Sequence, residues 1–405
     1  MTGLRVLLTT ESFLPHQSGV TVAVDALARG LGARGHEVLV LAPRPADDAP
    51  LPDVGSPGPA PRYAWLDSYQ LPAVAPPDYR MAWPLPWSAA LDAARAHRPQ
   101  VVHAHSPFVT GLMARRLAHA FDAPLIFTHH TRYADYAHYA GPVARLAGWG
   151  VGEYLQRFWR ACAAVVAPST DLAAEIRARA PERRVEVIPT GVDVAALGAL
   201  PPVDPRPLAG WPDDAVVAAC LGRLAPEKSP EILLEAVAIA SREVARLRLL
   251  LIGGGPSEAA LRRRAAAPDL AGRVAFTGAL PRPEALARLA GADLFVFASR
   301  TETQGLVLAE AMSVGLPAVA LDGPGVRDSV RDGIDGRIVT ADDPQRRASR
   351  LAQAIAWLAT DDAARSACAV HARAGAERFA IERRLEQTEA LYRSLVAVRG
   401  RDAPG

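Results

Sequence analysis

The stretch LFVFASRTETQGLVLAEAMSVGLPAVAL, residues 294–321, decides the fold. It contains two short apolar runs, residues 294–298 and 317–321, which have the length and the residue types of buried β-strands. Between them lies a helical pattern that begins near Gly305. A strand, a helix and a second strand in this order form a crossover unit, which joins parallel strands of one sheet.

The same alternation of strands and helices continues on both sides of this unit, in two separate sets. The first set has a helix over residues 20–34 and expected strands at residues 5–9, 37–41, 101–103, 125–127 and 163–166. The second set has expected strands at residues 215–221, 247–252, 274–277, 294–298, 317–321 and 337–339. We therefore predict an α/β protein of two domains, each a parallel sheet with helices on both faces.

Two proline-rich stretches interrupt the alternation. In residues 44–86 we expect no regular strand pairing, because proline lacks a backbone N–H and has a fixed φ, and we assign this stretch to a surface excursion. Residues 192–214 contain five prolines and are the best candidate for a domain boundary. The first domain is therefore placed at residues 1–195 and the second at residues 196–379.

The tail, residues 361–398, is arginine-rich and expected to be helical. Four of its apolar side chains fall on one face at helical spacing: Leu385, Leu391, Tyr392 and Leu395. A helix with one apolar face buries that face, so we expect the tail to cover part of the protein.

Composition and charge exclude several classes of protein. The chain has 405 residues, with 45 Lys and Arg against 43 Asp and Glu, so it lacks the basic field of a nucleic-acid binder. The first apolar run is too short for a signal peptide, and no run is long enough to span a bilayer. Three cysteines without C-x-x-C spacing, Cys162, Cys220 and Cys368, indicate buried thiols. We expect a cytoplasmic protein, which at most binds peripherally to the inner face of a membrane.

Carboxylates, cations and glycines follow the expected strands of the second domain. Glu302 and Glu310 can face one side of the strand-to-helix junction, which is where ligands bind in open α/β sheets. The spacing of the two acids would equally fit ordinary exposed acids near a helix start. Arg223 and Lys228, beside a helix N-terminus, suit a diphosphate, with a solvated loop as the alternative. Gly254, in a run of three glycines after a strand, could let the backbone approach a ligand or turn sharply.

The first domain contributes a histidine-rich loop, FTHHTRYADYAHY from residue 127, and the run Val-His-Ala-His at residues 102–105. Histidines in such a cluster could hold a metal ion, but H-E-x-x-H and cysteine partners are absent from the sequence. We expect no metal, and hydrogen bonding of the loop to a polar ligand instead. Gly19, in the first strand-to-helix loop, is by itself only a turn glycine.

Together these residues resemble family 4 of the retaining glycosyltransferases over nearly the whole chain. Glu302 and Glu310 match the family's E-x7-E pair, and Arg223 and Lys228 match its G-R-L-x-x-x-K motif. The resemblance implies the GT-B fold, in which two Rossmann-like domains face each other across a cleft. It also implies that a C-terminal helix, at about residues 380–405, crosses back to the first domain.

The resemblance also assigns roles to individual residues. Arg223 and Lys228 would bind the donor diphosphate, Glu302 the hexose and Glu310 the ribose. The remaining donor contacts would come from Gly19, Gly254, Gln304, Gly305 and Leu306. His130 would contact the hexose near C6, while the role of His129 stays open, and Thr131 and Tyr133 would lie at the acceptor. No metal ion or other cofactor is implied.

The E-T-Q-G-L-V-L-A-E form, with Gln304 where many members have phenylalanine, resembles the branch that acts on diacylglycerol-type lipids. It implies transfer of a hexose, with UDP-glucose as donor, to a membrane lipid. The alternatives are a mannosyltransferase or another hexosyltransferase with a soluble, polyprenyl or phospholipid acceptor, a sugar-nucleotide epimerase, and a two-domain sugar-binding protein. The aromatic and basic residues of the segment 143–160 fit a helix that contacts an anionic membrane peripherally. Alternatively, the aromatic residues cover the hydrophobic core of the first domain.

Overall fold

The computed structural model describes residues 3–46, 51, 54, 56–70, 79–84, 87–133, 144–341 and 343–402. The chain divides into two compact units: unit 1 comprises Met1–Gly191 and Ile381–Gly405, and unit 2 comprises Val192–Ala380. The boundary follows Gly191, whereas the sequence placed it after residue 195. The terminal segment from Ile381 belongs to unit 1.

Unit 1 is built on a parallel sheet, which has seven strands in the described part of the chain, in the order β3-β2-β1-β6-β7-β8-β9. These strands are β1 (Arg5–Thr9), β2 (Glu37–Pro43), β3 (Arg62–Leu66), β6 (Val101–Ala104), β7 (Leu125–Thr128), β8 (Ala164–Ala167) and β9 (Val185–Val187). A separate antiparallel pair joins β4 (Ser68–Gln70) to β5 (Arg80–Ala82). The strands expected in this half are confirmed.

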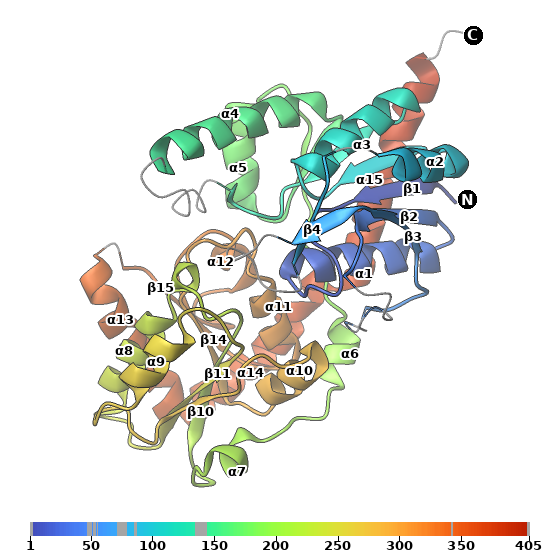
Figure 1. Ribbon diagram of the computed structural model, residues 1–405. Helices are drawn as coiled ribbons and strands as arrows, with labels where there is room; N and C mark the ends of the chain where they lie inside the picture. The colour runs from blue at the N-terminus through green and yellow to red at the C-terminus, as the bar shows by residue number, and fades with distance from the viewer. Residues whose placement is uncertain are drawn as a thin grey trace. The chain divides into compact units, whose positions relative to one another are not determined.

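Helices cover both faces of this sheet (Figure 1). They are α1 (Gly19–Ala33), α2 (Ser88–His97), α3 (Val109–Ala120), α4 (Ala144–Ala161), α5 (Thr170–Arg179) and α15 (Ile381–Asp402). Residues of β1 alternate between the two cores: Val6 and Leu8 pack with α1 and α15, while Leu7 packs with α2 to α5. In α15, Leu385, Leu391 and Tyr392 are buried, as the helical spacing of the tail predicts.

The prediction for residues 44–86 was wrong in two parts, because β3 and the antiparallel pair of β4 and β5 all lie in this stretch. The segment Arg62–Leu66 lies between the proline clusters and forms β3, which pairs in parallel with β2 from Leu39 to Pro43. Only five residues are needed for this edge strand, and RYAWL contains no proline. Proline-rich flanks therefore do not prevent a short strand between them.

Unit 2 contains a second parallel sheet, of six strands among the described residues, in the order β12-β11-β10-β13-β14-β15. These are β10 (Val216–Leu221), β11 (Leu247–Ile252), β12 (Val274–Phe276), β13 (Leu294–Phe297), β14 (Ala318–Leu321) and β15 (Gly336–Val339). All six strands predicted for this domain are confirmed.

Helices also cover both faces of the second sheet. They are α6 (Val194–Gly198), α7 (Pro205–Ala209), η2 (Pro226–Lys228), α8 (Pro230–Ala240), α9 (Glu258–Ala265), α10 (Arg282–Ala290), α11 (Leu306–Ser313), α12 (Val326–Ser329), α13 (Pro344–Thr360), α14 (Asp362–Ala376) and η3 (Glu377–Phe379). In Figure 1, α8, α9 and α13 lie on one side of the sheet and α10, α11 and α14 on the other. The break at residues 192–214 contains α6 and α7, which the sequence did not predict.

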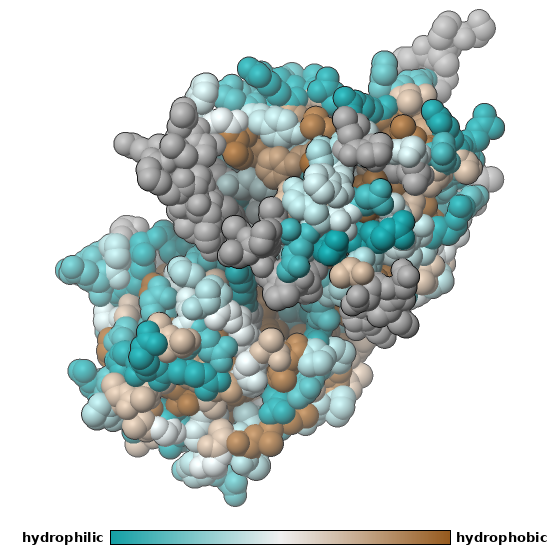
Figure 2. Space-filling model, viewed as in Figure 1, coloured by the Kyte–Doolittle hydropathy of each residue, from teal (hydrophilic) through white to brown (hydrophobic). Residues whose placement is uncertain are grey.

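The described surface is mixed in polarity on the face drawn in Figure 2, where hydrophilic residues alternate with small hydrophobic areas in both units. Among the described residues, no helix is long and apolar enough to cross a membrane. Cys162 and Cys368 are buried free thiols, as expected, whereas Cys220 is only partly buried.

Candidate functional site

In unit 2 the site residues gather where the strand order reverses. From β10 the chain proceeds outward through β11 to β12, then returns to β13 on the other side of β10. The loops after β10 and β13 therefore diverge at the carboxyl edge of the sheet, which is where open α/β sheets bind ligands. Arg223 and Lys228 lie in the first of these loops, and Glu302 in the second.

The structure brings Lys228 and Glu302 together. The Lys228 Nζ atom lies 2.5 Å from Glu302 Oε1, and the two side chains are 28% and 21% exposed. Lys228 ends the short helix η2, and Ser229, with φ of 49°, turns the chain into α8. Both charged groups therefore remain accessible to a polar ligand at the carboxyl edge of the sheet.

Arg223 lies on the same loop as Lys228, between β10 and η2. Its side chain is 49% exposed, and its Nη1 atom is 3.9 Å from Glu227 Oε1. The hydroxyl of Thr301 donates a hydrogen bond of 3.1 Å to the carbonyl oxygen of Glu227, which ties the loop after β13 to the loop after β10. Arg223, Lys228 and Glu302 thus belong to one pair of connected loops.

The turn Gln304-Gly305-Leu306 leads from Glu302 into α11. Gly305 has φ of 72° and precedes the helix without a side-chain cap, so the first-turn amides of α11 can meet an anion or a hydroxyl. The side chain of Gln304 is only 4% exposed. A Cβ atom at position 305 would add to the strain of a left-handed residue, which accounts for glycine there.

Glu310 is buried rather than exposed at a helix start. It is 3% exposed, and its Oε1 atom lies 2.6 Å from Nη1 of Arg282. Arg282 is the first residue of α10. A buried carboxylate needs such a cationic partner, so the reading of Glu310 as an ordinary surface acid is wrong.

Gly254 lies in a loop that packs against backbone. A Cβ atom at Gly253 would lie 2.1 Å from the carbonyl oxygen of Gly222, and one at Gly255 would lie 2.3 Å from that of Leu224. The amide of Leu224 donates to the carbonyl oxygen of Gly254. Close packing against neighbouring backbone, which the sequence did not predict, therefore accounts for Gly253 and Gly255.

Unit 1 has its own reversal of strand order, between β1 and β6. Gly19 begins α1 after β1, and Ser18 caps that helix by accepting from the amide of Thr21 at 3.2 Å. Within the described residues, no atom lies within 4 Å of the place a Cβ atom at Gly19 would take. Packing inside unit 1 therefore does not demand glycine at this position.

His130 and His129 follow β7 and have different surroundings. The Nε2 atom of His130 lies 2.8 Å from Nδ1 of His105, and burial lowers the pKa of His130 to about 4, so the ring is neutral at pH 7. His129 instead points into the core, where its Nε2 donates a hydrogen bond to the carbonyl oxygen of Thr131 and its ring packs against Trp159. His103 is held by Tyr392 and Thr128.

Thr131 and Tyr133 lie near these histidines. The amide of Tyr133 donates to the carbonyl oxygen of Thr131, and the Tyr133 ring meets Phe108 edge-on, with centroids 5.1 Å apart. Residues 134–143, including the rest of the histidine-rich loop, lie outside the described residues. In the described part of the chain, no three His, Cys, Asp or Glu side chains are arranged to hold a metal ion.

Glu11, which the sequence reasoning missed, lies at the same reversal point. It is 6% exposed and accepts from the amide of Thr110 at 3.1 Å, at the N-terminus of α3. Burial raises the pKa of Glu11 to about 7, against the opposing effect of amide hydrogen bonds from Thr110 and Val109. The available signal was an acid two residues after a buried strand, at the edge where Gly19 was already suspected.

Glu11→Gln is expected to flatten the pH dependence of stability. Because the folded pKa lies above the unfolded value, the stabilisation that this group provides is full below about pH 4.3 and is lost as the pH rises through about 7. The variant should therefore gain about 1–3 kcal/mol relative to the wild type between these pH values. Urea unfolding at several pH values checks this, and parallel curves for both proteins would contradict it.

The helix α4 divides its aromatic residues between core and solvent. Phe158 and Trp159 are 3% and 1% exposed, and the hydroxyl of Tyr154 donates to the carbonyl oxygen of Pro107. Trp149 is 67% exposed. Of the two readings of the segment 143–160, the core reading accounts for three of these four aromatic side chains, and Val143 lies outside the described residues.

Two family models match the chain. Residues 17–196 match Glycosyltransferase Family 4, and residues 206–374 match Glycosyl transferases group 1. The alpha-monoglucosyldiacylglycerol synthase of Streptococcus pneumoniae is 27% identical, over 83% of this chain and 75% of that protein. The GDP-mannose-dependent alpha-mannosyltransferase of Mycobacterium tuberculosis is 30% identical, over 88% of this chain and 89% of that protein.

A solved structure has the same fold. The sucrose-phosphate synthase of Thermosynechococcus elongatus aligns with a TM-score of 0.75 and 22% identity, over 97% of this chain and 99% of that one. At this identity the likeness concerns the fold, which is the GT-B arrangement of two parallel-sheet α/β domains with a helical C-terminus.

Proposed function

The chain belongs to glycosyltransferase family 4, and from that premise we propose that it transfers a hexose from a nucleoside diphosphate sugar to a membrane lipid such as diacylglycerol. The observation that carries this proposal is the ion pair of Lys228 and Glu302 at the carboxyl edge of the unit 2 sheet, with Arg223 on the same loop as Lys228. UDP-glucose is the proposed donor. The glucosyldiacylglycerol synthase among the relatives supports both the sugar and the lipid.

In the proposed reaction the bond between the anomeric carbon and the diphosphate breaks with retention of configuration. The acceptor hydroxyl oxygen bonds that carbon on the same face, and its proton passes to the departing diphosphate. Arg223 and Lys228 stabilise the negative charge that develops on this leaving group. The two cations and the amides of α11 can supply this stabilisation without Mg²⁺. Glu302 accepts hydrogen bonds from hexose hydroxyls, and Glu310 from the ribose.

The acceptor would bind to unit 1. Thr131 and Tyr133 lie beside His130, and Glu11 offers a buried carboxyl at the same edge of the sheet. A neutral His130 can donate or accept a hydrogen bond without adding charge next to the sugar. Peripheral contact with an anionic membrane, through exposed Trp149 and the nearby Arg157, would bring the lipid to this domain.

A second candidate is mannosyl transfer from GDP-mannose. It is favoured by the mannosyltransferase of Mycobacterium tuberculosis, which matches a larger share of this chain at a higher identity than the lipid glucosyltransferase does. The donor base and hexose distinguish the two candidates. Both use the same cationic loop and the same acids of unit 2.

Labelled UDP-glucose and GDP-mannose, each with anionic vesicles that do or do not contain diacylglycerol, test these proposals together. We expect labelled glycolipid only from UDP-glucose with diacylglycerol, unchanged rates after EDTA treatment, and co-flotation of the protein with the vesicles. Transfer from GDP-mannose alone would favour the second candidate. Conversion of the donor without any acceptor would indicate an epimerase, and an intact donor in every mixture would indicate a binding protein.

A further inference from the structure

Unit 1 has a cavity of about 810 Å³ at the amino edge of its sheet. Leu125 is the first residue of β7, Ala163 directly precedes β8, and both line the cavity. The loops that carry Gly19 and His130 leave the opposite, carboxyl edge of the same sheet. The cavity therefore lies apart from the site described above. Its volume is within the range of small-molecule sites.

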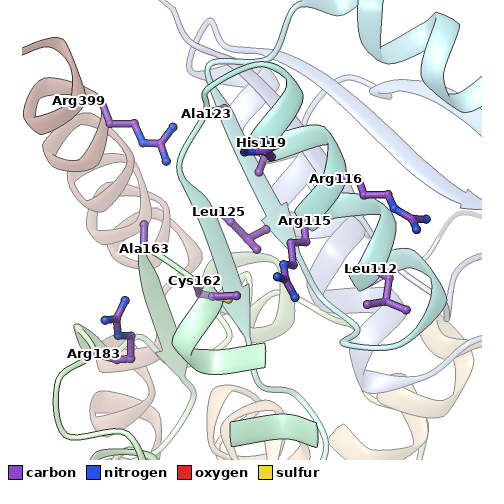
Figure 3. Close-up of a pocket in the computed structure, with 12 residues that line it drawn as sticks. Leu112, Arg115, Arg116, His119, Ala123, Leu125, Cys162, Ala163, Arg183 and Arg399 are labelled. Carbon is purple, nitrogen blue, oxygen red and sulfur yellow. The ribbon is translucent and has the colours of Figure 1, made fainter. Parts of the chain in front are cut away.

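The walls of this cavity carry positive charge. Arg115, Arg116, Arg183 and Arg399 line it together with His119, and none of its lining residues, all of which are described, is acidic. Figure 3 shows Arg115, Arg183 and Arg399 around Leu125 and Cys162, whereas Arg116 points away. The guanidinium of Arg116 stacks over the ring of Trp87, 4.8 Å from its centroid.

Two of the three guanidinium groups around Leu125 and Cys162 lack a strong counterion within the described residues. The Nη1 atom of Arg399 donates a hydrogen bond of 2.5 Å to Asp122 Oδ1, so the charge of Arg399 is largely balanced. The Nε atom of Arg183 is buried without a hydrogen bond, and Glu182 approaches it only to 3.8 Å. For Arg115 the described part of the chain provides no hydrogen bond or ion pair. The cavity thus has an excess of about two positive charges on planar donors.

The floor between these arginines is apolar. Leu125, Ala123 and Cys162 are buried beneath it, and Leu112 is 42% exposed at its rim. A bare inorganic anion would satisfy the guanidinium groups but would leave this apolar surface in water. A fitting ligand therefore combines an anionic head with an apolar body.

We propose that this cavity binds a phosphate monoester with an apolar substituent. A phosphate monoester carries close to two negative charges near neutral pH and has three acceptor oxygens, which matches the two uncompensated guanidinium groups better than one carboxylate does. Arg115 and Arg183 bind the phosphate, and the substituent lies over Leu125 toward Leu112. A soluble organic phosphate and the headgroup of a phosphatidic acid share this chemistry.

Isothermal titration with octyl phosphate, used below its micelle concentration, tests the site. We expect saturable binding to the full-length protein, weakened roughly tenfold by Arg115→Gln and by Arg183→Gln, because each removes one charge-assisted contact. Arg116→Gln is the matched control, since it changes the neighbouring arginine of the same helix and should leave the affinity within about twofold. Leu112→Glu, which places a negative charge at the rim, should weaken binding as well.

Further ligands separate the two sources of the phosphate and expose a false positive. Octanol and inorganic phosphate should each bind much more weakly than octyl phosphate. If the protein sediments with vesicles that contain phosphatidic acid, and Arg115→Gln reduces this sedimentation, the site binds a lipid headgroup. If the protein binds octyl phosphate but not these vesicles, the site binds a soluble ester. Equal affinity of the wild type and both arginine variants, or no saturable binding, would overturn the proposal. Because these experiments measure binding to the cavity and not catalysis, a negative result would leave the proposed sugar transfer unaffected.

Discussion

Lys228→Ala is expected to lower kcat by about a hundredfold or more, and Arg223→Ala to do the same. The departing diphosphate gains negative charge in the transition state, and these two side chains are the cations that the loop after β10 presents. A preorganised charge is effective because it need not reorient during the reaction. Steady-state kinetics at saturating donor and acceptor, with the identified sugar nucleotide, provide the measurement.

Two controls make this prediction specific. Arg242→Ala removes an exposed arginine of unit 2 between α8 and β11, at the opposite edge of the sheet, and should leave kcat unchanged. The double variant of Lys228→Ala with Glu302→Gln should lose less than the product of the two single losses, because the side chains form one ion pair. Unchanged turnover in both Arg223→Ala and Lys228→Ala would remove the cationic clamp from the mechanism.

Asp335→Ala is expected to lower the free energy of unfolding by about 2–4 kcal/mol. Asp335 is completely buried and accepts from the amide of Arg331 at 3.0 Å and from its guanidinium Nε at 2.9 Å. Arg378 Nη2 also approaches the same carboxylate, at 3.4 Å. Truncation would leave these donors without their acceptor. Urea unfolding at pH 7 measures the loss.

The stabilisation by Asp335 has a predictable pH dependence. Burial alone would raise the pKa of Asp335, but the hydrogen bonds from Arg331 outweigh burial and hold that pKa below its usual value. A lowered pKa means that the contribution is present above the unfolded value of about 3.9 and is lost as the pH falls through the folded value. The difference between Asp335→Asn and the wild type should therefore shrink below about pH 4. An equal difference at pH 7 and pH 3 would contradict this account.

Asp335 also supports the turn that leads into α11. Arg378 donates to the carbonyl oxygen of Ser329, and the hydroxyl of Ser329 donates to that of Gln304 at 3.1 Å. Asp332→Ala is the matched control, since this neighbouring acid is 49% exposed and pairs with Arg337 at 3.4 Å, and it should cost about 1 kcal/mol or less. The comparison separates the buried network from a general effect of losing an acid in this loop.

Much of the fold was predictable because strands and helices depend on patterns within a few residues. The run LFVFA, residues 294–298, is apolar and β-branched or aromatic at several positions, and its first four residues form β13. The short strand β3 was missed because its neighbours are proline-rich, although RYAWL itself has strand character. Local pattern is reliable when the flanking sequence does not contradict it.

The candidate site was predictable only in part. The identities of Arg223, Lys228 and Glu302 follow from their positions after expected strands, and the roles assigned to them stay predictions. The partner of Glu310 could not be predicted, because Arg282 lies on another helix and only packing brings the two together. Glu11 was missed for the same reason, since its elevated pKa comes from burial against α3, far along the chain.

The sequence by itself determined the alternation of strands and helices, the two-domain division, and the charged residues at the ends of the strands. The tertiary structure alone decided the order of the strands, and with it which loops meet. Lys228 and Glu302 are 74 residues apart in the chain, yet they form an ion pair because β10 and β13 are neighbours in the sheet. The physical reason is that secondary structure arises from short-range interactions, whereas strand order, burial and the pKa values of Glu11 and His130 depend on contacts between distant segments.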